Sequence, residues 1–501
     1  MKRQWFALLS IALFIAAVAV DLDATQVALN AVKEFLVRDF AIFFTGLATV
    51  CLPLVVWLGL DPRANIRLGP PGSRPVFSRL SWFSMLFSAG LASGLVYWAT
   101  AEPLTHFQQN PHLGNAEPGT AVAAISAITL TVVHWGLHGW AFYVLVGLAI
   151  AIAVYRYDQP LALRSALWPL LGARSHGPVG IGIDLIGVLG TVFGVATSIG
   201  LAVAGMNVAL ANLGGFEPSL QQQLVIVAGV GILGLMSVLS GVARGIRRLS
   251  VVNFWLSMLL LGAVLIIGPT RFLLQTIGDV AVDYGAKAVP MVLWTATDPG
   301  DQQWQGDWTI FYWGWWLAWA PFVGLFIARI SAGRSVREFV LGVLLVPTLV
   351  VIVWMSVFGG AALYNELPQT PNATTSLLPL VNADYAVGTT ALIEQLGVLV
   401  LPLTVLLAVL LFSWLITSID SATLVICHLL GGGGKDLHVS VMSKWLWSCL
   451  LALVTGALML MGGVPALQAA SIAVGLPVGL VLIVIVLSLV KVLFSEPRPP
   501  G

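Results

Sequence analysis

The chain has 501 residues, of which 58% are apolar and only 9% charged, and its mean hydropathy is +0.96. A soluble globular protein carries roughly 25% charged residues, because its surface faces water. The composition therefore excludes a soluble enzyme, a nucleic-acid-binding protein and a disordered chain. Apolar stretches of about twenty residues recur from end to end, which predicts an all-α integral membrane protein embedded in a lipid bilayer.

Charged residues divide the apolar stretches into twelve predicted transmembrane helices. They lie near residues 5–20, 41–59, 81–100, 120–154, 178–212, 222–244, 251–276, 308–329, 336–364, 390–426, 440–464 and 466–493. Several are longer than the roughly 20 residues that cross a bilayer, so we expect tilted or interrupted helices among them. The apolar N-terminus could also be a signal peptide, but the spans that follow favour an uncleaved first helix.

The distribution of basic residues predicts the orientation. If the N-terminus is inside, only four of the 23 lysine and arginine residues lie on the outer side, namely Lys33, Arg38, Arg271 and Lys287. The positive-inside rule then places both termini in the cytoplasm of a multi-pass protein of the cell's inner (plasma) membrane.

Spans three to seven and eight to twelve form two sets of five, and an odd number of spans inverts the second set relative to the first. This pattern predicts two peripheral helices (1–80), a first five-helix repeat (81–276), a second repeat (308–493) and a short cytoplasmic tail (494–501). Between the repeats, residues 277–307 are expected to contribute an amphipathic helix and loop on the outer surface. An ordinary outer loop is the alternative.

Few charged residues remain within the predicted spans. Asp184 lies near the start of the fifth span, Asp420 within the tenth, and Glu102 at the outer end of the third. Asp420 is the best candidate for a functional ionisable group, although a hydrogen bond between helices explains it equally well. The sequence indicates no chain of carboxylates and histidines for proton relay. Because motifs of hydrolases and metalloenzymes are also absent, the protein is not expected to be an enzyme.

Tryptophan is unusually abundant, with 19 residues, and several lie within spans rather than at the interfaces where tryptophan normally collects. In the eighth span, Trp315, Trp316 and Trp319 cover one face of the helix at 100° per residue, and Trp313 points away. In the fourth span, three aromatic residues occupy less than half of the circumference, namely Trp135, Trp140 and Tyr143. These two faces could close into an aromatic box, and a lipid-facing or packing stripe is the alternative.

An aromatic box selects a particular ligand. A quaternary ammonium group cannot donate a hydrogen bond, but indole faces attract it by roughly 0.5–2 kcal/mol for each good contact. Three or four rings therefore bind such a cation without a buried fixed anion.

Five stretches of the sequence resemble the betaine/choline/carnitine transporter family. The two most specific are HWGLHGWAFYVLVGLAIAIAVYRYDQPLALRSALWPLLG (134–172) and DWTIFYWGWWLAWAPFVGLFIARISAGRSVREFVLGVLLVPT (307–348), and weaker ones occupy 87–104, 190–201 and 415–425. The resemblance implies a five-plus-five inverted-repeat core of the leucine-transporter type, preceded by two extra helices. It also implies assembly as a homotrimer.

The resemblance further implies which residues bind the substrate. The trimethylammonium group would contact Trp135, Trp140, Tyr143, Trp315, Trp316 and Trp319. The substrate's carboxylate would approach a glycine-rich segment that includes Gly90, Leu91, Ala92 and Gly94. Relatives carry GxGxG or GxGxD there, and the aspartate is typical of choline-type members. Because this chain has Gly94 at that place, choline is disfavoured.

The resemblance assigns a sodium site to the same region. Thr417 and Ser418 match the hydroxyl residues that help coordinate sodium in sodium-coupled members, and the remaining ligands would be backbone carbonyls near Ser88 and Leu91. Oxygen atoms of this kind suit a hard cation. Sodium would be the coupling ion, and no other cofactor is expected. The alternative is that the hydroxyls bond back to their own helix.

The sequence therefore predicts a secondary active transporter that takes up a small zwitterionic quaternary ammonium compound, such as glycine betaine, by sodium symport. Proton-coupled uptake, or exchange of choline, carnitine or dimethylsulfoniopropionate, remains open. A membrane receptor that binds the same ligand without moving it is the alternative from another class.

Overall fold

The structure is a computed structural model that describes residues 2–70, 72–90, 92–113, 117–239, 243–368, 375–432 and 439–495. The secondary structure of these residues is helical, apart from one isolated antiparallel bridge between Arg67 and Ser335. The chain is therefore all-α over the described ranges, as predicted.

The helices follow one another in the order of their labels. The first half contains α1 (Lys2–Val20), α2 (Leu22–Leu60), η1 (Pro62–Asn65), α3 (Arg79–Gly90), α4 (Ala92–Gln108), α5 (Ala121–Trp135), α6 (Leu137–Arg156), η2 (Leu163–Leu167), α7 (Trp168–Leu171), η3 (Gly172–His176), α8 (Pro178–Gly214), α9 (Leu220–Leu239) and α10 (Ala243–Ile267). The second half contains α11 (Thr270–Leu293), α12 (Pro299–Gln305), η4 (Gly306–Ile310), α13 (Phe311–Ile330), α14 (Val336–Tyr364), α15 (Leu378–Ala383), η5 (Tyr385–Val387), α16 (Gly388–Gln395), α17 (Val400–Gly431), α18 (Val441–Leu460) and α19 (Val464–Ser495).

Ten helical stretches of the described chain are long and apolar enough to cross a membrane. They are Leu22–Leu60, Ala121–Arg156, Pro178–Gly214, Leu220–Val238, Arg248–Ile267, Pro299–Ile330, Val336–Tyr364, Val400–Gly431, Val441–Leu460 and Val464–Val492. The pair Arg79–Gly90 and Ser93–Gln108, bent by 61°, makes an eleventh if it is counted as one broken span, and Gln4–Val20 is a shorter apolar helix. A multi-pass membrane protein is thus confirmed, while the number twelve stays a prediction.

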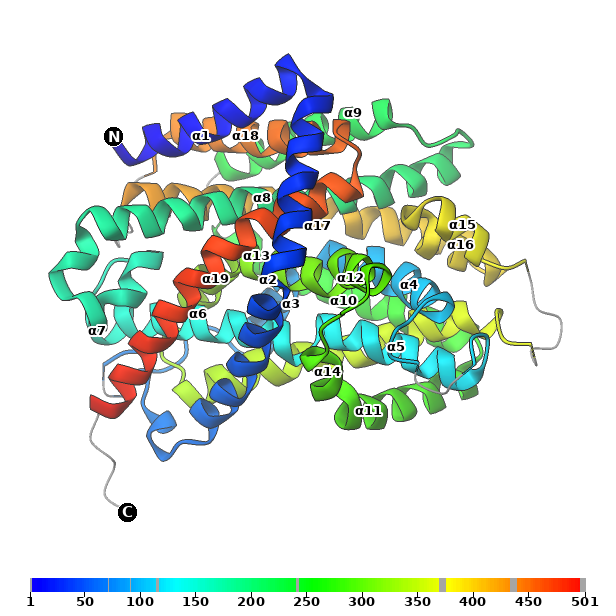
Figure 1. Cartoon of the computed structure of the whole chain (residues 1–501), viewed down its shortest axis with the longest axis horizontal. Coiled ribbons are helices and arrows are strands. Elements are labelled where there is room, and N and C mark those ends of the chain that lie inside the picture. Colours follow the sequence, from blue (N-terminus) through cyan, green and yellow to red (C-terminus); the bar gives the residue numbers. More distant parts are fainter. Residues whose placement is uncertain are drawn as a thin grey trace.

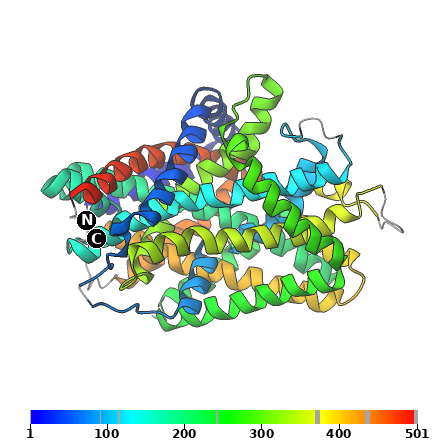
Figure 2. The ribbon, with the colours of Figure 1, turned by 90° about the horizontal axis from the view of Figure 1, so that it is seen from below.

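The long helices form one elongated bundle. In Figure 1, α6, α8, α14 and α17 run along the long axis, and α2 crosses them. The short helix α7 lies at one end of the bundle, and α15 and α16 lie at the opposite end. In Figures 1 and 2 the beginning of α1 and the end of α19 lie at the same end as α7.

Several predicted boundaries are wrong; the seventh span, for example, ends with α10 at Ile267 and not at 276. The second span is not confined to 41–59, because α2 is continuous from Leu22; the side chain of Asp21 caps it by accepting a hydrogen bond from the Ala24 amide at 2.9 Å. The tenth span does not begin at 390. Gly397 and Leu399 have positive φ angles of 68° and 56°, which end α16 and turn the chain before α17 begins.

The predicted amphipathic helix before the second repeat corresponds to α11, which begins earlier than residue 277. Its buried residues recur every three or four positions, at Leu273, Thr276, Val280, Tyr284 and Ala288. This face packs against α5 and α14, and the Tyr284 hydroxyl accepts a hydrogen bond from the Leu137 amide at 3.0 Å. The helix is therefore tied to the start of α6.

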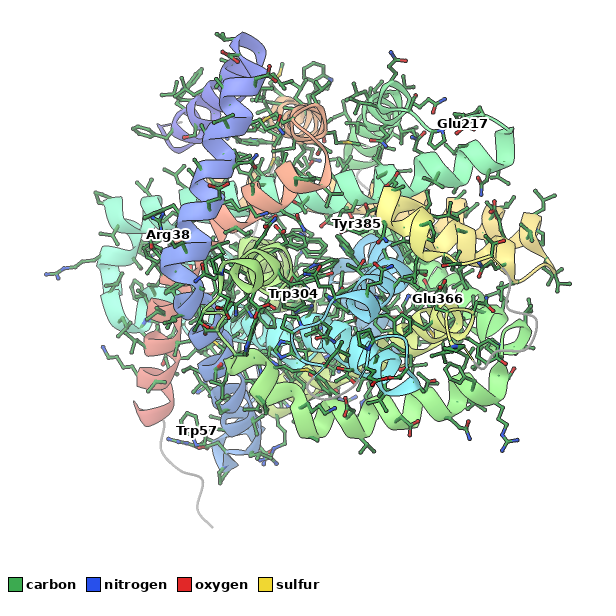
Figure 3. All side chains as sticks on the ribbon, turned by 45° about the vertical axis from the view of Figure 1, so that its right-hand side comes forward. Arg38, Trp57, Glu217, Trp304, Glu366 and Tyr385 are labelled. Atoms are coloured by element: carbon green, nitrogen blue, oxygen red, sulfur yellow. The ribbon has the colours of Figure 1, made fainter. Side chains whose placement is uncertain are left out.

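Helix α13 lies in the centre of the bundle, packed against α6, α8 and α19. Close packing with α19 depends on Gly314, since a Cβ atom there would lie 2.8 Å from the Cα atom of Ile472. Figure 3 shows Arg38, Trp57 and Glu217 at the edge of the molecule and Trp304 nearer its middle. The tryptophans of α13 are at most 7% exposed, so its aromatic face is directed at other helices.

Candidate functional site

The structure brings the six aromatic residues of the fourth and eighth spans into one cluster, the aromatic box. Its members are Trp135, Trp140, Tyr143, Trp315, Trp316 and Trp319, which are between 0% and 7% exposed. The ring of Trp316 is central, with centroids 6.0 Å from Trp135, 5.9 Å from Trp140 and 4.9 Å from Tyr143. The box residues therefore contact one another across α5, α6 and α13.

The remaining rings extend the box along α13. Trp315 stacks on Trp319 at 6.0 Å with an interplanar angle of 12°, and it meets Trp135 edge-on at 5.7 Å. Trp313 belongs to another environment, because its ring lies 6.3 Å from His134 and 6.1 Å from His138. The helical-wheel argument thus separates Trp313 correctly from its neighbours. Because the rings contact one another, they must separate to admit a ligand.

Glycines form the other side of the box. A Cβ atom at Gly90 would lie 2.3 Å from the Trp140 ring, and one at Gly139 would lie 2.6 Å from the Trp316 ring. At Gly94 a Cβ would lie 2.8 Å from both Trp135 and Trp315. Gly90 and Gly94 flank the bend between α3 and α4, so bare backbone touches the indoles where the span is broken. Leu91 and the side chain of Ala92 lie outside the described parts of the chain.

A methyl group at position 94 is expected to destabilise the protein. Gly94→Ala would press on two indole rings, and overpacking of this kind costs about 1–3 kcal/mol. At roughly 1 °C per kcal/mol for a chain of about 500 residues, the apparent Tm of the purified protein should fall by about 1–3 °C. Gly229→Ala in α9 is the matched control, because a Cβ there meets no atom within 4 Å. A Tm equal to or above that of the parent is expected for it, and an equal result for Gly94→Ala would contradict the packing argument.

The polar atoms of the box divide into two groups. The indole N–H groups of Trp315 and Trp316 donate to the carbonyl oxygens of Gly194 and His134 at 3.1 and 2.9 Å. By contrast, three buried polar atoms have no partner among the described residues, namely Trp140 Nε1, Tyr143 Oη and Trp319 Nε1. Buried donors are normally satisfied, so these three groups are available to a ligand, although five indole N–H groups outside the box also have no partner among the described residues.

Three of the four predicted sodium-site residues also lie together, and the fourth, Leu91, is outside the described residues. Ser88 of α3 and Thr417 and Ser418 of α17 line one cavity of about 10 Å³, which is roughly the space that a single water molecule needs. The Ser88 hydroxyl is buried without a partner among the described residues. Thr417 Oγ1 bonds back to the carbonyls of its own helix at 3.0 and 3.1 Å, which uses its hydrogen and leaves oxygen lone pairs for a cation.

The sequence indicated no chain of carboxylates and histidines for proton relay, but the structure brings Glu102 together with His106 and His134. Glu102 does not simply end the third span; it is fully buried, and its Oε1 atom lies 2.6 Å from His134 Nδ1 and 3.3 Å from His106 Nε2. The histidines come from α5 and α4. The spacing of Glu102 and His106, four residues apart on one helix face, is the signal in the sequence that could have indicated this cluster.

The other acidic residues have structural partners. Asp420 of α17 accepts a hydrogen bond from the Ser237 hydroxyl of α9 at 2.8 Å, so the alternative of a bond between helices is the one observed. Asp184 of α8 forms a buried ion pair with Arg164 of η2. These two carboxylates hold helices together and are not part of the aromatic box.

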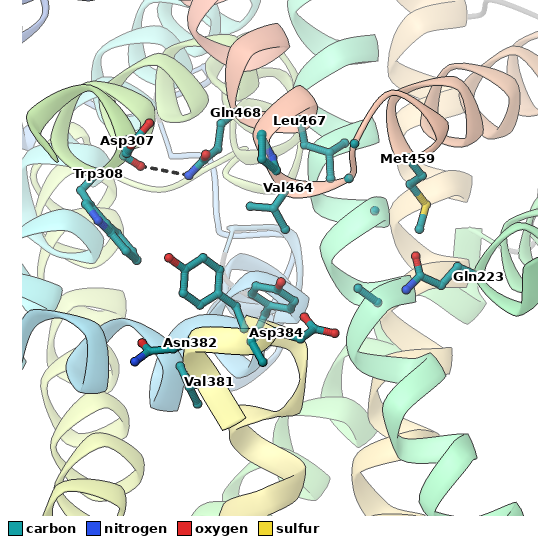
Figure 4. Close-up of a pocket in the computed structure, with 18 of the residues that line it drawn as sticks. Gln223, Asp307, Trp308, Val381, Asn382, Asp384, Met459, Val464, Leu467 and Gln468 are labelled. Atoms are coloured by element: carbon teal, nitrogen blue, oxygen red, sulfur yellow. Dashed lines mark hydrogen bonds between the residues drawn. The ribbon is translucent and has the colours of Figure 1, made fainter. Parts of the chain in front are cut away.

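A cavity of about 630 Å³ lies on the side predicted to face outward, and we call it the outer vestibule. Its lining includes Lys33, Tyr97, Trp308, Asp384 and Tyr385. Figure 4 shows Gln468 donating a hydrogen bond to Asp307 beside Trp308, and the backbone carbonyl is its acceptor, at 2.9 Å. The vestibule is separate from the aromatic box, but Trp308 connects it to the cluster around Glu102, since its ring lies 4.6 Å from His106.

Sequence comparison identifies the family. Residues 4–498 match the profile of BCCT, the betaine/carnitine/choline family transporter. The chain belongs to this family. It is therefore a transporter and not an enzyme, as predicted from the absence of catalytic motifs.

Individual relatives cover almost all of the chain. A glycine betaine transporter of Acinetobacter baylyi is 36% identical over 487 residues, which are 96% of this chain and 72% of the relative. The glycine betaine transporter OpuD of Bacillus subtilis is 36% identical over 477 residues, 95% of this chain and 91% of the relative. The osmo-dependent choline transporter BetT2 of Acinetobacter baylyi is 36% identical over 482 residues, 95% of this chain and 68% of the relative.

Proposed function

We propose that the protein is a secondary active transporter that takes up a small zwitterionic quaternary ammonium compound, such as glycine betaine, by sodium symport with alternating access. The observation that carries the proposal is the aromatic box at the break between α3 and α4. Relatives named as glycine betaine transporters support the substrate class.

The chemistry of the box fits both ends of glycine betaine. Its methylated ammonium group attracts indole faces, and several rings together supply several kcal/mol at about 0.5–2 kcal/mol each. Its carboxylate needs hydrogen-bond donors, and Trp140 Nε1–H and Tyr143 O–H are buried donors without partners among the described residues. Choline has no carboxylate to accept from them. Gly94 also favours the zwitterion, because the aspartate that the resemblance implies here for choline-type members would repel a carboxylate.

Sodium coupling is supported by the small cavity beside Ser88, Thr417 and Ser418. A cation there would hold α3 against α17, and α3 leads into the break at Gly90. Sodium and substrate would therefore stabilise the same arrangement of the broken span. A ligand that favours one conformation raises the affinity of every other ligand that favours it.

Twelve spans, two inverted five-helix repeats and a homotrimer complete the proposal. The broken span α3–α4 would begin the first repeat, and α13 the second. Interrupted helices near the substrate are typical of transporters built in this way. Both termini would be cytoplasmic in the inner (plasma) membrane, in agreement with the beginning of α1 and the end of α19 lying at one end of the molecule (Figure 1).

Flux measurement tests the proposed function. Proteoliposomes that contain the purified protein should accumulate labelled glycine betaine when sodium is high outside, and uptake should fall at least ten-fold when potassium replaces sodium. Unlabelled carnitine, choline and dimethylsulfoniopropionate, added as competitors, rank the substrates. Uptake driven by a pH gradient alone, or only by substrate on the other side, would replace sodium symport with proton coupling or exchange. Binding without flux would indicate a receptor.

A further inference from the structure

Four hydrogen-bonding groups converge on the buried carboxylate of Glu102. Its Oε1 atom faces the two histidines described above. Its Oε2 atom accepts from the indole N–H of Trp135 at 3.0 Å and from the hydroxyl of Tyr312 at 2.5 Å. Among the described residues, no lysine or arginine is paired with Glu102. The carboxylate is thus stabilised by neutral donors and by imidazoles, whose charge depends on pH.

The geometry defines the protonation pattern of the cluster. An ionised carboxylate only accepts, so His134 donates through Nδ1 and leaves Nε2 to accept from the Thr309 hydroxyl, 3.1 Å away. His106 donates through Nε2, and its buried Nδ1 has no partner among the described residues. This arrangement has a net charge of −1. One further proton, which the free Nδ1 of His106 can accept, makes the cluster neutral.

The other titratable groups around the cluster do not account for a proton bound here near neutral pH. Tyr312 on α13 and Tyr97 on α4 are fully or almost fully buried phenols, which ionise far above neutral pH. His112 follows α4, and burial lowers its pKa to about 4, so it stays neutral above that value. Asp384 and Tyr385 face the vestibule, and Tyr284 on α11 bonds to the backbone of α6. Glu102, His106 and His134 are therefore the groups that share a proton here.

The cluster is in direct contact with the aromatic box. Trp135 donates to Glu102, and Trp316 donates to the backbone carbonyl of His134. On its other side, His106 packs against Trp308, which lines the vestibule. The indole ring of Trp308 thus lies between the cluster and the vestibule, while the other rings of the box lie immediately beyond Trp135.

We propose that Glu102, His106 and His134 form one proton-binding site whose charge controls the affinity of the aromatic box for its cation. The proposal rests on the proposed function, because it requires a quaternary ammonium ligand in the box. The sign follows from electrostatics. The unprotonated cluster attracts the ammonium group, and an added proton cancels that attraction. Ligand binding must therefore release protons, and affinity must rise as pH rises through the titration of the site.

Calorimetry on the whole purified protein in detergent, at saturating sodium and with EDTA, tests the proposal. Glycine betaine is titrated between about pH 5 and 8.5, in two buffers that differ in ionisation enthalpy, so that released protons are counted. For one buried charge at about 10 Å, the affinity should rise roughly ten-fold from the acidic to the basic plateau. Glu102→Gln, which keeps the shape and the acceptor for Trp135, should bind without pH dependence and release no protons. A parent with a flat profile would overturn the proposal.

If Glu102→Gln does not fold, two further variants test the same proposal. His106→Gln should also flatten the pH profile, because it removes the ring with the free nitrogen. His138→Gln is the matched control, since His138 is equally buried but has no hydrogen bond to Glu102; it should keep the parent's profile. A merely structural role for the cluster would lower the Tm of His106→Gln and leave the profile unchanged, and that result would overturn the proposal.

If glycine betaine does not bind, the proton site can still be tested separately from the proposed function. Absence of binding at every pH contradicts the proposed function alone, and the proton site is then followed without ligand through tryptophan fluorescence. Imidazolium groups near Trp135 and Trp308 change their emission, so the parent should show a pH transition that Glu102→Gln and His106→Gln lack and His138→Gln keeps. Identical titrations of all four proteins would overturn the proton site.

Discussion

Replacing Trp316 with leucine is expected to weaken the binding of glycine betaine ten-fold or more, since this ring contacts three other members of the box. Loss of one buried cation–π contact of about 1.5–2 kcal/mol corresponds to a change of this size. Leucine retains an apolar side chain in the core, so the protein should still fold. The measurement is a titration of purified protein, followed by tryptophan fluorescence or calorimetry, together with its apparent Tm.

Two other tryptophans serve as comparisons for this result. Trp140→Leu should weaken binding by a similar factor, because Trp140 faces the same space. Trp313→Leu is the matched control: it is the same substitution on the same helix as Trp316→Leu, but its ring packs beside His134 and His138. We expect a much smaller loss of affinity for it. Equal affinities in the three variants and the parent would contradict the aromatic box.

Removing two hydroxyl groups is expected to raise the sodium requirement of transport. In the double variant Thr417→Ala, Ser418→Ala, the sodium concentration for half-maximal uptake should increase at least ten-fold. The affinity for substrate at saturating sodium should change far less. The reason is linkage: sodium favours the binding-competent conformation only through its own differential affinity, and the variant reduces that affinity without altering the aromatic box.

Uptake against sodium concentration, at matched protein levels, separates this expectation from a packing role. Thr417 bonds back to its own helix, so a purely structural hydroxyl would lower expression or Tm and leave the sodium curve in place. Thr404→Ala provides the control, because this threonine makes the same kind of bond to Val400 in α17 without lining the small cavity. Unchanged half-saturation in the double variant would reject the sodium site.

Much of the fold could be predicted because lipid imposes a simple rule on sequence. Apolar length locates helices, and each of the twelve predicted spans overlaps a helix of the structure. The 100° rotation per residue also separated Trp313 from Trp315 and Trp316. The residues at which helices begin and end were harder to predict. The part of α2 before residue 41 contains charged residues such as Lys33 and Arg38. These residues interrupt the apolar pattern and so indicate a loop, although lysine and arginine favour helix.

Only the Glu102–His106 pair of the cluster could have been predicted, because the other groups come from distant parts of the chain. Glu102 and His134 are 32 residues apart, and Tyr312 is 210 residues from Glu102. Single-helix periodicity has no information about which helices become neighbours. For the same reason, the tryptophans alone indicated an aromatic face and the resemblance supplied Gly90 and Gly94, while Gly139 became apparent only in three dimensions.

The glycines beside the aromatic box have a consequence for substrate range. Because Gly90, Gly94 and Gly139 present bare backbone to the rings, the proposed ligand space would be bounded by the absence of side chains as much as by tryptophan. Substitutions of the tryptophans change only the rings that attract the cation, and leave the glycine backbone that limits the space unchanged. A library for altered selectivity should therefore vary the three glycine positions together with the facing rings, pairing each added methyl group with a smaller aromatic partner.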